Sequence, residues 1–448
     1  MTTGARFCVT GTFVAVALLA FGQVSAARQE ADARGETETE TVPAEGEQQS
    51  PDIAELERRL DVLAEEVERL RSGEEQALEL TEDDTRALGL APSAAATYES
   101  GGGVSLAGYG EMLFENFAGE DAAGQPTGKG SQFDFLRAII YAGYRFNDQF
   151  LFNSEIEIEH ANEIFVEFAY VDYLVHDNLG IRGGILLLPM GLVNEFHEPT
   201  VFLGTQRPIT EQRIIPSTWR ENGGGVHGSV GLVAYRAYVV NGLEATGFSA
   251  TGIRDGRQKG SKAKAANLAF TGRVDVTPTP GIFVGASIYS GGSGQGDVEI
   301  DGRSFDVRTT IFDVHGQAQI RGFDLRGLLA RAHIDDAAEL NRVLGLTGPS
   351  GVAAAMQGGY VQLGYNVLSQ VTTNGVGLTP YVRYEKVDTQ ATMPAGFERS
   401  PSTNSTFSTL GVEVKPISNV VVKADYAWVG NEANTGVNQF NISLGYAF

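Results

Sequence analysis

Residues 439–448 of the chain read QFNISLGYAF. Large apolar side chains occupy every second position of this stretch, namely Phe440, Ile442, Leu444, Tyr446 and Phe448, and the side chains between them are polar or small. A period of two residues predicts a β-strand, because successive side chains of a strand point to opposite faces of the sheet. The stretch therefore predicts a strand with one apolar face and one polar face.

The same alternation recurs from residue 104 onward, for example at 150–159, 266–277 and 419–430. About sixteen such segments can be marked, and their connections alternate between tight turns and long loops. A soluble sandwich turns its apolar faces inward, whereas an outer-membrane barrel turns them to lipid and has short turns at one end only. The sequence therefore predicts an all-β fold, a transmembrane antiparallel β-barrel of about sixteen strands over residues 98–448.

The beginning of the chain has the features of an export signal. Arg6 is followed by an apolar run over residues 7–21 and by the small residues Val24-Ser25-Ala26, which is typical of a signal peptide over residues 1–26. The single cysteine of the sequence, Cys8, lies inside this run. We therefore expect an exported mature chain with no disulfide bond.

Two further segments are expected between the signal peptide and the barrel. Residues 27–51 are acidic and poor in large apolar side chains, which predicts a disordered linker. Over residues 52–72 the apolar side chains are spaced alternately by three and four residues, at Ile53, Leu56, Leu60, Leu63, Val67 and Leu70. This spacing predicts a short α-helical coiled coil in the periplasm, the alternative being an amphipathic helix packed on the barrel mouth. Residues 73–97 are expected to be a second linker.

Composition narrows the classes of function. The net charge is −23, so no basic surface for nucleic acid is expected. The mature chain has no run of the roughly eighteen apolar residues that a transmembrane helix needs. No spacing typical of a phosphate-binding loop or of a nucleophile with its base stands out. We therefore expect neither an enzyme nor a cofactor.

The longest loop, residues 189–223, contains prolines and large apolar residues that allow it to pack. We expect it to fold into the barrel and to narrow the pore, where rings of charge set selectivity. The predicted pore constriction consists of Arg207, Arg213, Arg220, Glu195, Glu198, Glu211 and Glu221. The alternative is an outer cap in which these charges are solvated.

The polar faces of the predicted strands would form the pore wall. Alternation places there Arg137, Arg145, Glu155, Glu157, Glu159, Glu167, Arg273 and Arg383. Acid–base catalysis would need buried carboxylates, which a wet lumen does not supply. His197 and Glu198 are adjacent, but no third ligand stands at helical or hairpin spacing from them, so no metal site is predicted.

A resemblance to a known family rests on the same loop, in which residues 189–194 read PMGLVN and residues 215–221 read IPSTWRE. Together with the export signal, the terminal Tyr446-Ala447-Phe448 and the strand count, these motifs resemble phosphate-selective porins of the O/P type. The resemblance covers most of the predicted barrel, and its specific motifs lie in this one loop. It implies a homotrimer with a water-filled pore in each barrel, and selectivity for phosphate through basic side chains. The predicted wall carries both signs of charge.

Two functions follow from these features. The barrel favours a bacterial outer-membrane porin for passive diffusion of small hydrophilic solutes or ions, among them anions such as phosphate. The coiled coil favours a structural outer-membrane protein tethered to a periplasmic partner or to the cell wall. In either case we expect outer-membrane lipid and identical subunits as partners. The C-terminal Phe448 resembles the signal that the barrel assembly machinery reads.

Overall fold

The structure is a computed structural model, and it describes residues 80–176, 178–371 and 375–448. All of these residues belong to one compact unit, Val67–Phe448, which is the second of two into which the chain divides. In this described part of the chain, no helix is long and apolar enough to cross a membrane.

Three predicted segments lie outside the described residues: the signal peptide 1–26, the linker 27–51 and the coiled coil 52–72. They stay predictions.

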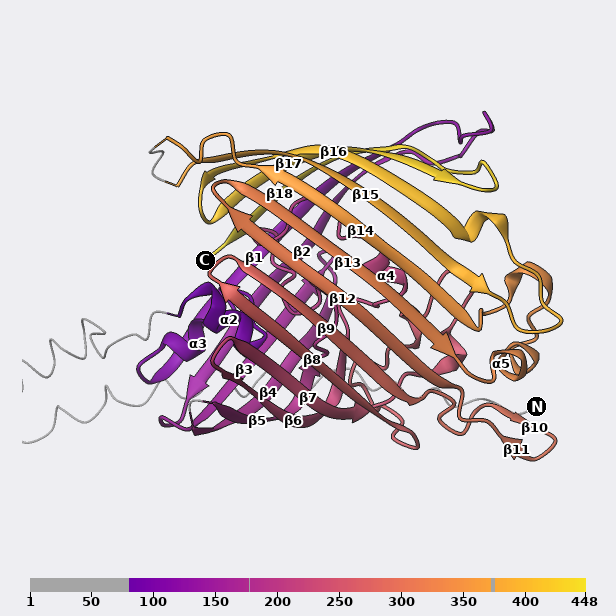
Figure 1. Ribbon diagram of the computed structural model, residues 1–448, viewed down its shortest axis with the longest axis horizontal. Helices are drawn as coiled ribbons and strands as arrows, with labels where there is room; N and C mark the ends of the chain where they lie inside the picture. Colours follow the sequence, from indigo (N-terminus) through magenta and orange to yellow (C-terminus); the bar gives the residue numbers. More distant parts are fainter. Residues whose placement is uncertain (1–79, 177, 372–374) are drawn as a thin grey trace, which may run out of the picture. The chain divides into compact units, whose positions relative to one another are not determined.

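Sixteen strands form one closed antiparallel barrel (Figure 1). In chain order they are β1 (Gly103–Phe117), β2 (Ser131–Arg145), β3 (Phe150–Glu159), β4 (Glu163–His176), β5 (Leu179–Leu187), β6 (Arg220–Val230), β7 (Val233–Asn241), β8 (Leu268–Thr279), β9 (Ile282–Gly292), β12 (Arg308–Ile320), β13 (Phe323–Ile334), β14 (Ala355–Tyr365), β15 (Gly377–Thr392), β16 (Asn404–Ile417), β17 (Val420–Asn431) and β18 (Gln439–Ala447). The last strand returns to pair with the first, with Ala447 opposite Tyr109, so the sheet has no free edge. The predicted all-β barrel of about sixteen strands is confirmed.

The alternation in the sequence sorts the side chains between the two faces of this sheet. On β17, Val422 is 39 % exposed on the outer face, whereas the next residue, Lys423, is fully buried on the inner face. On β13, Leu329 is 66 % exposed and Ala330 is buried. The outer face of the barrel is therefore apolar, and the charged side chains of the strands gather inside, as in a barrel that faces lipid.

The connections alternate in length along the chain. Those at one end include the short turns 146–149, 231–232 and 321–322, and those at the other include the long loops 188–219 and 242–267. Figure 1 shows the C-terminus with the helices α2 (Glu82–Leu88) and α3 (Ala96–Glu99) at one end, and α5 (Ala337–Val343) with the hairpin β10 (Glu299–Ile300) and β11 (Arg303–Ser304) at the other. This asymmetry is the one that the sequence predicts.

A β-bulge interrupts the alternation on β4. Glu155 of β3 lies opposite Phe168, but the next residue of β3, Ile156, lies opposite Val166. Glu167 is therefore the extra residue, and both Glu167 and Phe168 are buried. Because a bulge re-aims side chains locally, it turns two consecutive residues of β4 toward the interior.

The N-terminal segment, residues 80–100, packs inside the barrel. Its helix α2 contacts β6 and β7, and α3 contacts β1, β2 and β3. Thr81 and Asp84 form a capping box at the start of α2, and Gly89 ends this helix with φ +68°. A side chain at Gly89 would meet the carboxylate of Glu195. Residues 73–79 of the predicted linker 73–97 lie outside the described residues, so the linker stays a prediction. Over residues 80–97 the structure has helices and a packed segment, because the uncharged run 87–97 can be buried at little cost.

Candidate functional site

The loop 188–219 between β5 and β6, here called the inner loop, lies inside the barrel. Asp425 of β17 accepts a hydrogen bond from the amide nitrogen of Thr205 at 2.8 Å. Glu385 of β15 accepts one from the amide nitrogen of Ile209 at 3.0 Å. Hydrogen bonds to charged groups contribute about 1.5–3 kcal/mol each, more than neutral ones. The wall therefore holds the inner loop by its backbone.

A buried lysine makes a further attachment. The Nζ atom of Lys423 donates to the carbonyl oxygens of Phe202 at 2.6 Å and Gly204 at 3.1 Å. The same ammonium group lies 4.1 Å from the centre of the Phe202 ring. Because an ammonium group buried without partners is costly, these contacts fix Phe202 against the wall.

Two predicted constriction glutamates, Glu195 and Glu211, contact groups other than the predicted constriction arginines. The carboxylate of Glu195 lies 3.2 Å from Nε of Arg236 and 3.6 Å from a guanidinium nitrogen of Arg273. One oxygen of Glu211 accepts hydrogen bonds from the amides of residues 192 and 193, each at 2.8 Å. Glu211 is in the short helix α4 (Thr210–Arg213), so its bonds fold the inner loop onto itself.

Two other predicted constriction residues begin strand β6. Arg220 forms an ion pair with Glu167 of β4 at 2.7 Å, on the inner face of the barrel. Glu221 accepts a hydrogen bond from the amide nitrogen of Gln258 at 2.9 Å, which ties the loop 242–267 to the strand. Both charges are thus paired or bonded within the protein.

The predicted constriction residues Arg207 and Arg213 lie in the inner loop. Arg213 is half-buried, and its carbonyl oxygen accepts a hydrogen bond from the amide of Ile253. Arg207 is buried, and one of its guanidinium nitrogens has no hydrogen-bond partner in the part of the chain that the structure describes.

Two arginines of the neighbouring loop, Arg254 and Arg257, join Arg207, and the three are called the loop arginines below. Burial lowers the pKa of each of them, and the nearby charges of further arginines, Arg137 and Arg220 included, lower it more. Within the described ranges, none of the three makes an ion pair with a carboxylate. Sequence reasoning did not find Arg254 and Arg257, because their place depends on how the loop 242–267 folds over the inner loop.

The predicted wall residues all lie on the inner face of the barrel: Arg137, Arg145, Glu155, Glu157, Glu159, Glu167, Arg273 and Arg383. Most of their charges have partners. Arg137 lies 3.5 Å from both Glu111 and Glu157, and Arg273 lies 2.7 Å from Asp275. Arg383 instead donates to the carbonyl oxygen of Gln206 in the inner loop at 3.1 Å, and Arg145 donates to two carbonyl oxygens of the N-terminal segment.

The N-terminal segment is attached to both the wall and the inner loop. Arg182 of β5 donates to the carbonyl oxygen of Leu88 at 3.1 Å, and Arg236 of β7 donates to that of Ala87 at 3.2 Å. The predicted constriction residue Glu198 accepts hydrogen bonds from the amide and hydroxyl of Ser93, at 3.0 and 3.1 Å. Glu198 therefore joins the inner loop to the N-terminal segment.

Two cavities of the barrel are lined in part by the inner loop. One, of about 400 Å³, is lined by the N-terminal segment, the inner loop and the wall residues Arg273, Arg326 and Glu413 among others. The other, of about 290 Å³, is lined by Arg137, Arg207 and Arg254 and by the acidic residues Glu111, Glu115 and Asp134 among others. The ring of Phe202 borders both cavities.

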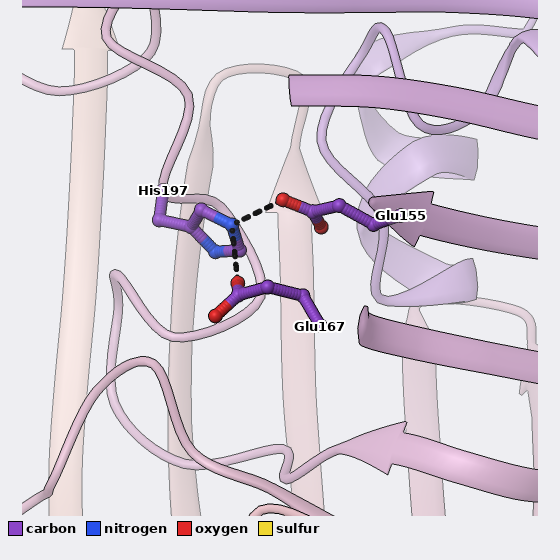
Figure 2. A group of neighbouring side chains, drawn as sticks. All are labelled: Glu155, Glu167 and His197. Carbon is purple, nitrogen blue, oxygen red and sulfur yellow. Dashed lines mark hydrogen bonds and ion pairs between the residues drawn. The ribbon is translucent and has the colours of Figure 1, made fainter. Parts of the chain in front are cut away.

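One histidine of the inner loop lies between two carboxylates of the wall. Figure 2 shows the His197 ring directed toward Glu155 of β3 and Glu167 of β4. The Nε2 atom of His197 lies 3.2 Å from an oxygen of each. Burial opposes protonation of the imidazole, but the two carboxylates outweigh it and raise the pKa of His197 to about 10. Sequence reasoning missed this group, because His197 belongs to a long loop, and alternation along strands does not show where a loop side chain meets the wall.

No family model matches the chain, but its sequence is similar to that of a known protein. A protein of Aquifex aeolicus described as an uncharacterized protein is 38 % identical over 354 residues, which are 75 % of this chain and 78 % of that protein.

Solved structures show a related fold. OmpF of Salmonella typhi, in complex with daunomycin, has a TM-score of 0.51 and 11 % identity, over 78 % of this chain and 98 % of that one. An anion-selective porin from Comamonas acidovorans has a TM-score of 0.48 and 12 % identity, over 77 % of this chain and 99 % of that one. The similarity to OmpF shows that the barrel has a porin fold.

Proposed function

The chain belongs to the same family as the uncharacterized Aquifex aeolicus protein, and we propose that it is an outer-membrane porin for passive diffusion of small hydrophilic solutes. The observation that carries this proposal is the inner loop. The barrel has an apolar outer face, and this long loop is hydrogen-bonded to its inner wall. Such a loop would narrow the lumen of the barrel without filling it. The two cavities that the inner loop lines are where solutes would pass.

We further propose that the channel prefers anions. Most charges on the wall are paired, so they attract a passing ion weakly. The loop arginines Arg207, Arg254 and Arg257 lack carboxylate partners among the described residues, and a guanidinium nitrogen of Arg207 and of Arg254 is buried with no partner. An anion would supply the missing acceptor, since the guanidinium group matches carboxylate and phosphate. Phosphate, which the resemblance of the inner loop implies, is one such anion.

The test is the sign of selectivity in a planar bilayer. Wild-type protein in a salt gradient should give a reversal potential that favours anions. Replacing all three loop arginines with alanine should move it toward cations, by about 1 kcal/mol or more of relative barrier for charges within about 4 Å at an effective dielectric constant near 20. If the protein conducts no ions at all, the porin proposal fails.

A matched control separates local charge from net charge. Arg303, Arg331 and Arg342 are exposed, and replacing these three removes the same total charge outside the inner loop. This variant should keep the wild-type reversal potential, because exposed charges more than about 8–10 Å from the path are screened by salt. Equal shifts in both variants would contradict the role of the loop arginines.

Three further proposals concern place and partners. The apolar outer face would lie in the lipid of a bacterial outer membrane, the barrels would form a homotrimer, and Phe448 would be read by the barrel assembly machinery. The side chain of Phe448 is 65 % exposed at the end of the last strand, which leaves it available for recognition. Cross-linking in detergent and the assembly of a Phe448→Ala variant would test the last two.

A second candidate function is a tether. The observation that favours it is the N-terminal segment, whose packing inside the barrel would transmit a load from residues 1–79 to the wall. A tether should co-sediment with cell-wall material, and deletion of residues 27–79 should abolish this. Silence in the bilayer together with such binding would favour the tether over the porin.

A further inference from the structure

His197 has its ring orientation and its tautomer fixed by the inner loop. Its Nδ1 atom lies 2.9 Å from the carbonyl oxygen of Asn194. A carbonyl oxygen only accepts, so Nδ1 carries a hydrogen and donates it. Asn194 is itself held, since its side chain donates to the carbonyl oxygens of Leu188 and Trp219 and accepts from the Trp219 amide. This is how proteins orient a metal-binding histidine, with the second nitrogen left facing the ligand.

The second nitrogen of His197, Nε2, lies close to two carboxylate oxygens, but it can carry only one hydrogen. Nε2 lies 3.2 Å from Oε1 of Glu155 and 3.2 Å from Oε2 of Glu167, but a single N–H bond points to only one of them. The contact to Glu155 has hydrogen-bond geometry, and that oxygen of Glu167 has no hydrogen-bond partner among the described residues. The second oxygen of Glu155 has none either. Both side chains are 0 % exposed, so these oxygens are costly as they stand.

A third unpartnered oxygen lies beside this group. The hydroxyl of Tyr109 on β1 is buried and has no hydrogen-bond partner in the described part of the chain. The centre of the Tyr109 ring is 6.2 Å from that of the His197 ring, so this buried hydroxyl belongs to a side chain that packs near the histidine.

We propose that Glu155, Glu167 and His197 bind a divalent transition-metal ion of the zinc type. The three ligand atoms, one from each residue, lie within 4.8 Å of one another. In a tetrahedral zinc site with bonds of about 2.0–2.1 Å, ligand atoms are about 3.3 Å apart, which is close to the two nitrogen–oxygen distances here. An imidazole ligand excludes magnesium and calcium, which take oxygen ligands.

The surroundings define how each carboxylate binds. Arg220 donates to Oε1 of Glu167 at 2.7 Å, so this residue offers its other oxygen alone. Glu155 has no such donor on its free oxygen. The ion would replace the proton on Nε2, and with the charge of Arg220 the group would carry one net positive charge. Because His197 belongs to the inner loop and the carboxylates to β3 and β4, the ion would clamp the loop to the wall.

A second histidine of the interior provides a contrast. His315 places Nδ1 at 2.6 Å from Asp313 and Nε2 at 2.9 Å from Asp275. Each nitrogen therefore faces its own carboxylate, so the two carboxylates do not meet at one nitrogen. Among the described histidines, only His197 brings two carboxylates to one nitrogen. His315 is therefore the matched control.

The experiment uses the full-length protein folded in detergent, stripped with a chelator and then dialysed against Zn²⁺. Metal analysis should find about one zinc ion per chain. His197→Gln and Glu155→Gln should lower the affinity by more than about 100-fold, since even loss of an outer-shell partner costs about 10- to 100-fold. His315→Gln should bind like wild type. Zinc is also added during refolding, so that slow entry to a buried site does not hide binding.

Heat-dependent gel migration shows whether each variant has folded. If a variant does not fold, a spectroscopic measurement on wild-type protein still tests the proposal. Wild-type protein loaded with Cu²⁺ should show a coordinated imidazole nitrogen in pulsed electron paramagnetic resonance. The proposal is overturned if wild type retains no zinc, if no nitrogen is coordinated, or if His315→Gln loses as much affinity as His197→Gln. None of these measurements requires conduction, so their outcome is independent of the porin proposal.

Discussion

Two stretches of chain occupy the barrel interior, and they are held there in different ways. The inner loop is attached by buried charged groups of the wall, such as Asp425, Glu385 and Lys423, and is joined to a strand at both ends. The N-terminal segment is attached through its own carbonyl groups to Arg182 and Arg236, and among the described residues it joins a strand at its C-terminal end. The comparison predicts that the inner loop stays in place when the N-terminal segment is removed.

The largest effect is expected from removing the N-terminal segment. Deletion of residues 27–100 should leave a folded barrel, because no strand is lost, and should raise single-channel conductance by roughly twofold or more as the lumen beside β1–β7 fills with water. Bilayer conductance and heat-dependent gel migration measure the two outcomes. A barrel that folds with unchanged conductance would show that the segment lies beside the conducting path.

A smaller effect is expected from loosening the inner loop. Asp425→Asn with Glu385→Gln should weaken the bonds to the amides of Thr205 and Ile209. The free energy of unfolding should fall by about 2–4 kcal/mol in total, and the open channel should become noisier. Thermal unfolding and current noise are the measurements.

The control for loosening the loop removes the same charges elsewhere. Asp301→Asn with Glu299→Gln changes exposed residues in and beside the hairpin β10–β11. This variant should behave like wild type. If it lowers stability as much as the loop variant, net charge rather than loop attachment explains the loss.

The third effect concerns the boundary between the two cavities. Phe202→Ala should raise conductance modestly, because Phe202 lines both cavities and a smaller side chain there would widen the space between them. Phe196 is the matched control, since it is an aromatic residue of the same loop that borders only one cavity. A larger rise in Phe196→Ala would mean that solutes do not pass Phe202.

The smallest effect is a pH dependence of selectivity. Burial lowers the pKa of Lys259, the charges of Arg257 and neighbouring arginines lower it further, and Glu159 opposes them. As the pH rises, Lys259 should lose its proton before an ordinary lysine does, so the preference for anions should weaken. The measurement is the reversal potential of wild type and of Lys259→Arg as the pH rises. The variant should keep its preference for anions, since arginine stays charged.

Lys264 in the same loop is the control for this titration. Hydrogen bonds to Asp297 and Glu244 raise the pKa of Lys264 to about 12, so it should keep its proton over the same range. Lys264→Arg should therefore titrate like wild type. If the pH dependence disappears in Lys264→Arg and persists in Lys259→Arg, the titrating group is Lys264 and the prediction for Lys259 is wrong.

The fold could be predicted from the sequence because one physical rule, alternation between lipid and water, acts on every strand. The same rule placed Arg137 and Glu155 on the inner face. It could not place His197 between Glu155 and Glu167, because His197 lies in a long loop and alternation acts only on strands. Nor could it bring Arg254 to Arg207, since two loops meet there through contacts far apart in sequence.

The N-terminal segment shows the limit of composition. The uncharged run 87–97 consists mostly of alanine and other small residues, which is typical of a linker, but the structure buries part of it. What decides its place are arginines of the wall, such as Arg182 and Arg236, whose donors need acceptors. The sequence lists these arginines but does not show which carbonyl groups they reach.

The wall binds one part of the inner loop, residues 202–209, through main-chain groups, and this has a consequence for how such a protein can change in evolution. Asp425 and Glu385 contact amides, and Lys423 and Arg383 contact carbonyl oxygens. Every residue type except proline offers both groups. Mutations within residues 202–209 can therefore exchange side chains while the same four wall residues keep this part of the loop in place. For the proposed porin, this means that the lining of the lumen could change during evolution without first requiring a new way to fold the loop.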